Sequence, residues 1–109
     1  MCQYQTLYHH AQHGNVLRCT ECDQIQVGFG FVLLNLTEDV FYSLHRYLLE
    51  CCTQPSENRH IRNRILPMPY DGIQLMMSTD ELEQFCRMID HAESELRAQE
   101  LIRLFMKTQ

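Results

Sequence analysis

The chain has 109 residues, which is enough for one domain with a substantial core, and 45% of them are hydrophobic. That composition excludes an intrinsically disordered chain. The formal net charge of -5 gives the molecule as a whole no attraction for nucleic acid or for an anionic membrane.

No segment has the pattern of a targeting or membrane sequence. Residues 1–15 are polar and lack the apolar core of a signal peptide, and no apolar run approaches the roughly 18 residues of a membrane span. We therefore expect a cytoplasmic protein without membrane contact. In that compartment its six cysteines should be reduced or metal-bound rather than paired in disulfides.

The first 23 residues are predicted to form a β-hairpin. Strands over Gln3–His10 and Val16–Cys19 flank Gly14–Asn15, a dipeptide typical of tight turns. If the turn has two residues, His10 lies directly opposite Cys19, and a four-residue loop keeps His10 on the same face. The hairpin therefore brings a histidine toward a cysteine.

Cys19 and Cys22 form a Cys-x-x-Cys pair at the end of this hairpin. That spacing turns two thiolates toward one point, which is half of a tetrahedral zinc site. Further donors lie upstream in the sequence. We predict a structural zinc ion held by Cys19, Cys22, Cys2 and His10.

Other interpretations of this region stay open. An odd-length loop would bring His9 to the site in place of His10, and His13 is a further donor. Without a metal, Cys19 and Cys22 would be two thiols in a turn. The enzymatic alternative is a redox or zinc-dependent centre at this pair. A redox pair, however, needs its first cysteine at a helix N-terminus, and this pair lies between predicted strands.

Residues 24–52 are predicted to form a ββα unit. Strands over Gln24–Phe29 and Phe31–Leu36 lead to Thr37, a helix N-cap that Glu38–Asp39 follow in the first turn, where carboxylates favour the helix dipole. Apolar residues then recur at helical spacing and predict about four turns with one buried face. These residues are Val40, Phe41, Leu44, Tyr47, Leu48 and Cys51.

Residues 59–107 predict a second unit of the same kind. Strands over Arg59–Leu66 and Ile73–Met77 lead to Ser78, which forms a capping box with Glu81. The helix behind this box is predicted to bury one stripe of residues. The stripe consists of Leu82, Phe85, Cys86, Ile89, Ala92 and Leu96.

The two units match in pattern along the chain. When Thr37 is placed on Ser78, Leu48 falls on Ile89, and strands, cap and helix coincide. We therefore predict one α+β domain over residues 1–109. Its two ββα units are expected to join into one mainly antiparallel sheet with both helices on one face, and the N-terminal hairpin is added to them.

The predicted strand over Arg59–Leu66 carries a basic cluster. His60, Arg62 and Arg64 alternate on one face of it, with Tyr70 nearby in sequence. A nucleic-acid surface would use such residues for phosphate contacts and stacking. A charged outer strand face that discourages edge-to-edge pairing explains the same pattern in an acidic protein, so nucleic-acid binding is not expected.

The end of the second helix breaks the phase of its apolar stripe. After Leu96 the expected positions are polar, and large apolar residues instead occupy Leu101, Ile102, Leu104 and Phe105. We predict that this end projects past the sheet and forms a homodimer contact, because such a patch left in water favours association. The alternative is that the helix end folds back over the N-terminal hairpin.

The chain resembles an uncharacterised family of short proteins from Bacteroidota. The resemblance lies in Cys2, the Arg-Cys-x-x-Cys-x-x-Ile run at Arg18–Ile25, and the apolar strand with its capped helix over Phe31–Leu48. It implies a bacterial domain of unknown function, with a family metal site at the cysteines if one exists. It assigns no active-site residues.

These observations favour a non-enzymatic domain with a structural zinc ion that acts through protein contacts. Neither a phosphate-binding loop nor a catalytic triad pattern is apparent in the sequence. A thiol- or zinc-dependent enzyme centred on Cys19 and Cys22 is the alternative function, and nucleic-acid binding through Arg59–Arg64 is the third.

Overall fold

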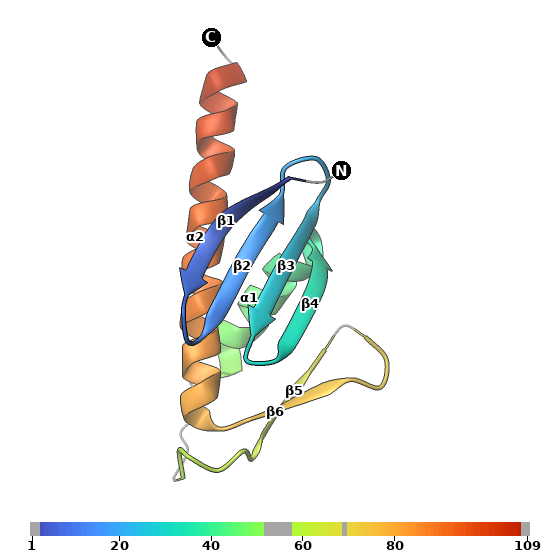
Figure 1. Ribbon diagram of the computed structural model, residues 1–109, viewed down its shortest axis with the longest axis vertical. Coiled ribbons are helices and arrows are strands. Elements are labelled where there is room, and N and C mark those ends of the chain that lie inside the picture. Colours follow the sequence, from blue (N-terminus) through green and yellow to red (C-terminus); the bar gives the residue numbers. More distant parts are fainter. Residues whose placement is uncertain (1–2, 52–57, 69, 108–109) are drawn as a thin grey trace.

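The computed structural model describes residues 3–51, 58–68 and 70–107, which form two antiparallel sheets and two helices (Figure 1). The larger sheet has four strands in the order β1-β2-β3-β4, and the smaller sheet pairs β5 with β6. The predicted α+β class and the N-terminal hairpin are confirmed. The elements are β1 (Tyr4–His10), β2 (Gly14–Cys19), β3 (Gln24–Phe29), β4 (Val32–Thr37), α1 (Glu38–Cys51), β5 (Arg64–Pro67), β6 (Gln74–Met77) and α2 (Thr79–Lys107).

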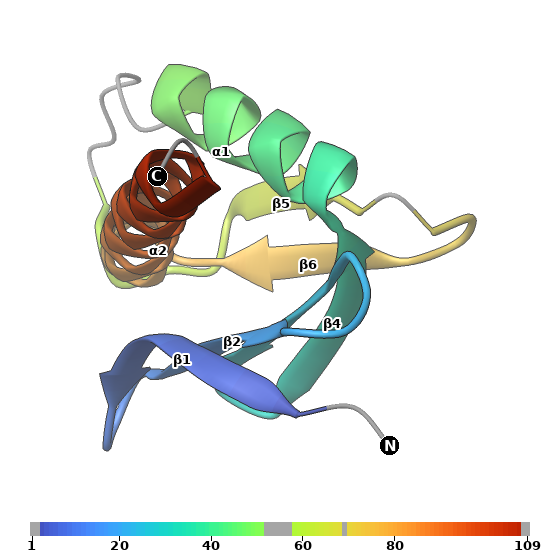
Figure 2. The same ribbon diagram turned by 90° about the horizontal axis from the view of Figure 1, so that it is seen from above.

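Both helices lie on the same side of the four-stranded sheet (Figure 2). Helix α2 contacts β1 and β2, whereas α1 contacts β3, β4 and α2. Alternate sheet residues such as Val16, Ile25 and Val27 face the helices and are at most 1% exposed. The helix side of the core consists mainly of Phe41, Leu44, Leu48, Leu82, Phe85, Met88, Ile89, Ala92 and Leu96.

Each helix begins at the predicted cap. Thr37 Oγ1 accepts a hydrogen bond of 3.3 Å from the backbone N–H of Val40. Ser78 Oγ accepts one of 3.1 Å from Glu81 N–H, and the Glu81 carboxylate accepts one of 2.9 Å from Ser78 N–H. The second arrangement is the reciprocal capping box. Because the caps satisfy backbone donors that the helices leave unpaired, they fix where both helices start.

The two units do not join into one sheet, and this part of the prediction is wrong. β5 and β6 have four residues each and pair only with each other among the described strands. Pro67 ends β5 and offers no N–H, which limits this strand to an edge position. The β5–β6 hairpin is connected to β4 through Tyr70, whose hydroxyl donates a hydrogen bond to the backbone oxygen of Asn35.

The strand predicted over Arg59–Leu66 is much shorter in the structure. β5 begins only at Arg64, and its inward residue is Leu66, which is 2% exposed. Ile61 and Ile65, which alternate in sequence with His60, Arg62 and Arg64, are exposed. The residues before β5 instead follow the start of α2, where their arginines meet carboxylates.

The turn of the N-terminal hairpin lies earlier than Gly14–Asn15. β1 ends at His10, β2 begins at Gly14, and these two residues are register partners. Gly14 has φ +141° and runs so close to β3 that a Cβ atom there would lie 1.9 Å from the backbone oxygen of Gly28. Gly14 therefore serves a close approach of strands and not the reversal that the sequence predicted.

We expect Gly14→Ala to lower the free energy of unfolding by about 3 kcal/mol or more, because backbone strain and a clash add together. Gly30→Ala is the matched control: Gly30 also has a positive φ, +61°, but has open space around its Cα. The control should lose only about 1 to 2 kcal/mol. Urea unfolding followed by circular dichroism measures both. Equal losses in the two variants would contradict the close approach at Gly14.

Candidate functional site

The Cys-x-x-Cys pair lies in the tight turn that joins β2 to β3. Cys19 ends β2 and is fully buried, whereas Cys22 is exposed. Neither residue is in a disulfide. Thr20 donates hydrogen bonds from its backbone N–H (2.8 Å) and from its hydroxyl (3.2 Å) to the backbone oxygen of Gln3. The start of the described chain is therefore held directly against this turn.

The three histidines predicted as donors lie at the opposite end of the hairpin. The register partner of Cys19 is Tyr4, and His10 pairs with Gly14 at the far end of β2. The five residue steps from Gly14 to Cys19 span roughly 17 Å of strand. The predicted facing of His10 and Cys19 is thus wrong, and His9, opposite Asn15, lies at the same distant end.

His10 instead organises the hairpin turn. Its Nδ1 atom accepts hydrogen bonds of 3.2 Å from the backbone N–H groups of Gln12 and His13. Its ring also stacks on the His13 ring, with 4.1 Å between centroids and 14° between planes. Because the His10 side chain accepts hydrogen bonds from two turn residues, the turn does not need a glycine at its centre. The prediction of a turn at Gly14–Asn15 was wrong for this reason.

Cys2, the predicted third ligand, lies outside the described residues. Within residues 3–51, 58–68 and 70–107, one group of three or more potential ligand atoms from His, Cys, Asp or Glu lies mutually within 4.8 Å. That group is His45, Asp90 and Glu93. The described part of the chain therefore brings no third donor of this kind to Cys19 and Cys22.

Cys86 departs from the expectation of reduced or metal-bound thiols. Cys86 on α2 is disulfide-bonded, and its partner lies outside the described residues. Its Sγ lies 3.6 Å from the backbone oxygen of Leu48, so it faces the end of α1. The prediction of Cys86 as a simple buried apolar side chain is therefore corrected.

The basic cluster is largely compensated by the first turn of α2. Arg62 forms two hydrogen bonds of 2.9 Å to the Glu81 carboxylate. Arg59 pairs with Asp80 at 2.9 Å and with Glu83. The Arg62 hydrogen bonds, followed by the one from Ser78 N–H, lower the pKa of Glu81 below its ordinary value. Positive charge engaged in this way leaves a weak basis for phosphate contacts.

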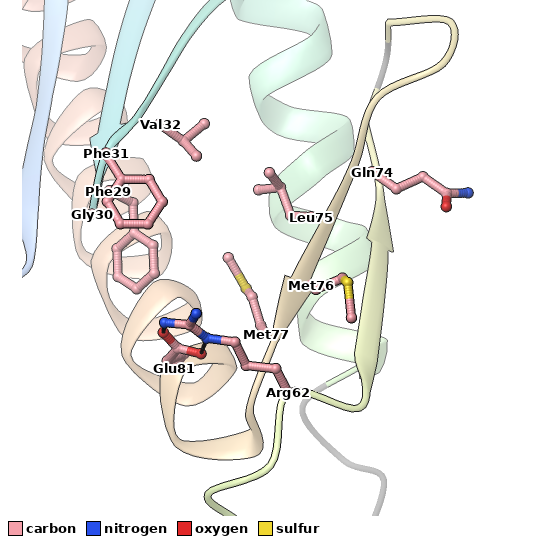
Figure 3. Close-up of a pocket in the computed structure, with 10 residues that line it drawn as sticks. All are labelled: Phe29, Gly30, Phe31, Val32, Arg62, Gln74, Leu75, Met76, Met77 and Glu81. Carbon is pink, nitrogen blue, oxygen red and sulfur yellow. Dashed lines mark hydrogen bonds and ion pairs between the residues drawn. The ribbon is translucent and has the colours of Figure 1, made fainter.

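A small cleft lies between the β3–β4 turn and β6 (Figure 3). Phe29 and Val32 line one side, Leu75 and Met77 the other, and the Arg62–Glu81 pair lies at one end. Gln74 and Met76 point away from the opposing wall. The volume of about 220 Å³ is below the roughly 300–1,000 Å³ typical of small-molecule sites.

The group of His45, Asp90 and Glu93 was missed by sequence reasoning. His45 comes from α1, and the two carboxylates lie three residues apart on one face of α2. The His45 Nε2 atom lies 2.8 Å from Asp90 Oδ1 and 3.9 Å from Glu93 Oε2. The only signal in the sequence was a charged residue at position 93 inside an otherwise apolar helix stripe.

The last turns of α2 stand clear of the rest of the fold. The helix continues to Lys107 and projects past the four-stranded sheet (Figure 1). From Leu101 onward every described residue is exposed. The predicted projection is confirmed, and the helix end does not fold back over the hairpin. The large exposed side chains are Leu101, Ile102, Leu104, Phe105 and Met106, between 56% and 71% exposed.

A comparison with protein families supplies a match over nearly the whole chain. The model of a family of unknown function, DUF6686, covers residues 1–106. The chain belongs to DUF6686. The resemblance to an uncharacterised family is thereby confirmed, and the DUF6686 description carries no activity or ligand. Comparisons with curated proteins and with solved structures find no match.

The helices of this DUF6686 chain were also compared with the requirements of a membrane span. Among the described residues, no helix combines the length and the apolar character that crossing a bilayer demands.

The Arg62–Glu81 pair predicts a pH effect on the DUF6686 fold. Because the pKa of Glu81 is lowered in the folded chain from its ordinary value of 4.5, its carboxylate stabilises the fold above that pH. This contribution is lost as the pH falls through the folded-state pKa. We expect Glu81→Gln to destabilise clearly at pH 7 and less at pH 3, as measured by urea unfolding.

Asp71→Asn, in the exposed loop of the β5–β6 hairpin, is the control and should change the free energy of unfolding little at either pH. A cost of Glu81→Gln that is the same at both pH values would contradict a stabilising ionised carboxylate at this position.

Proposed function

We propose that the chain is a protein-interaction domain that forms a homodimer through the last two turns of α2. The observation that carries this proposal is the exposed apolar end of that helix. Its members, Leu101, Ile102, Leu104, Phe105 and Met106, are contiguous in sequence apart from Arg103. Monomeric proteins seldom leave so many large apolar side chains together in water.

The change of face along α2 explains why this end is exposed among the described residues. Phe85, Ile89 and Leu96 are fully buried against the sheet and α1. The next positions of that stripe, Gln99 and Arg103, are polar, so the apolar face rotates away from the core. A helix end without tertiary packing is marginal in water, and packing against a partner would stabilise it.

The distribution of charge favours a second copy of the chain in antiparallel orientation. The charged residues from Leu101 to Lys107 are both basic, Arg103 and Lys107. The acidic residues Glu95 and Glu100 come earlier along α2, next to its buried section. Two helix ends that overlap antiparallel about a two-fold axis place each basic end beside the acidic section of the other. A parallel overlap would bring like charges together.

We expect Leu101→Glu/Phe105→Glu to halve the mass measured by light scattering, because two carboxylates would be forced into the apolar contact. Circular dichroism should retain the helical signal, since both residues lie outside the core. The control is Leu33→Glu/Ile65→Glu, which changes two side chains that are each 59% exposed elsewhere on the surface. This control should stay dimeric.

A monomeric mass for the unchanged protein at about tens of micromolar would end the dimer proposal. Loss of the dimer in both double variants would also count against it, because the contact would then not be confined to the end of α2.

A structural zinc ion at Cys19 and Cys22 is a second, independent proposal. The observation that supports it is the pair of hydrogen bonds from Thr20 to Gln3, which hold the residue after Cys2 against the cysteine turn. A ligand set of Cys19, Cys22 and Cys2 would provide three thiolates, which zinc accepts in tetrahedral sites. His10 is not part of this proposal, because it lies at the other end of β2.

We expect protein purified without added metal to contain about one zinc ion per chain by elemental analysis, because thiolate ligation of structural zinc is tight. Cys22→Ser should remove this zinc and loosen the β2–β3 turn. Cys51→Ser, a change on α1 away from the turn, should retain it. If freshly reduced protein contains no zinc, the zinc proposal is wrong and Cys19 and Cys22 are two thiols in a turn.

A further inference from the structure

We infer that His45, Asp90 and Glu93 bind a divalent first-row transition-metal ion between α1 and α2. The three side chains come from α1 and α2, which contact each other, so a shared ion would link the two helices. One imidazole nitrogen and two carboxylate oxygens are ligands that such ions accept. This site uses no cysteine and is separate from the zinc ion proposed at the β2–β3 turn.

The spacing of the ligand atoms suits a shared cation. Ligand atoms bound to one ion at about 2.1 Å are themselves roughly 3.0–3.4 Å apart. The His45 Nε2 atom is 2.8 Å from Asp90 Oδ1 and 3.9 Å from Glu93 Oε2, values that bracket this range. The ligand atoms of all three side chains lie within 4.8 Å of one another.

The buried carboxylate of Glu93 is the strongest argument for a bound cation. It is 5% exposed, and a buried carboxylate needs compensation for the water it has lost. Arg97 donates to Oε1 of Glu93 from the solvent side, where the Arg97 side chain is 71% exposed. The other oxygen, Oε2, is directed toward His45 at a distance beyond a normal hydrogen bond. A cation at this point would complete the coordination of Oε2.

The charges around this group also favour a cation. Two carboxylates, those of Asp90 and Glu93, lie beside the His45 imidazole, and the Arg97 guanidinium pairs with Glu93. The pKa of Tyr42, one turn before His45, is raised by burial and then by the charges of Glu38, Glu93 and Glu100. Both observations place carboxylate charge around this group.

Mn²⁺ alone is the probe, because this ion prefers oxygen and nitrogen ligands over thiolates and so separates the two proposed sites. Added below one equivalent to the full chain, it should broaden the amide NMR signals around His45 and Asp90–Glu93 first. The signals around Cys19–Cys22 should broaden later or not at all. Broadening that spreads evenly over exposed carboxylates would overturn the inference.

Asp90→Asn and His45→Gln should each weaken Mn²⁺ binding by at least about tenfold. Asp90 is exposed, so its variant is expected to fold as the unchanged chain does. His60→Gln is the matched control: His60 also pairs with an aspartate, Asp80, at 3.1 Å, but its side chain is 87% exposed and has no third ligand of this kind in the described chain. It should bind Mn²⁺ as the unchanged chain does. Equal binding by all three variants would leave only an ion pair between the helices.

Discussion

The burial of one face of α2 is the interaction on which the rest of the structure depends. Phe85, Met88, Ile89 and Leu96 have no exposed surface, and each such side chain contributes roughly 1.5–3 kcal/mol by leaving water. The same helix contacts β1 and β2 of the sheet, the neighbouring helix α1, and β6. Without this face, the four-stranded sheet would have one side open to solvent and the β5–β6 hairpin would lose its support.

Much of this fold could be predicted because it rests on local patterns. In the caps at Thr37 and Ser78, a hydroxyl group accepts a hydrogen bond from the backbone N–H three residues later. Such spacing is visible in a sequence. The apolar stripe of α2 and the point where it ends after Leu96 depend on helical periodicity alone. The division into two sheets was not predictable in this way, because pairing between short strands is decided by tertiary contacts such as that of Tyr70 with β4.

The candidate sites were predicted less well, and the reasons are physical. The register of the hairpin depends on how His10 closes its turn and on how closely Gly14 approaches Gly28, and neither contact follows from residue type. His45 and Asp90 lie 45 positions apart in the sequence, so no local spacing could have predicted that they lie close together. The Cys-x-x-Cys turn was placed correctly between two strands, because both cysteines lie within one short segment.

We propose that α2 has a buried section that holds the fold and that its last two turns pack against a second copy. Amide hydrogen exchange along α2, measured at several protein concentrations, tests this claim most directly. The account predicts slow exchange at Phe85–Leu96 at every concentration. At Leu101–Lys107 it predicts protection that rises with protein concentration, because association is what would order that end. Fast exchange at Leu101–Lys107 at all concentrations, or protection there that does not change with concentration, would contradict it.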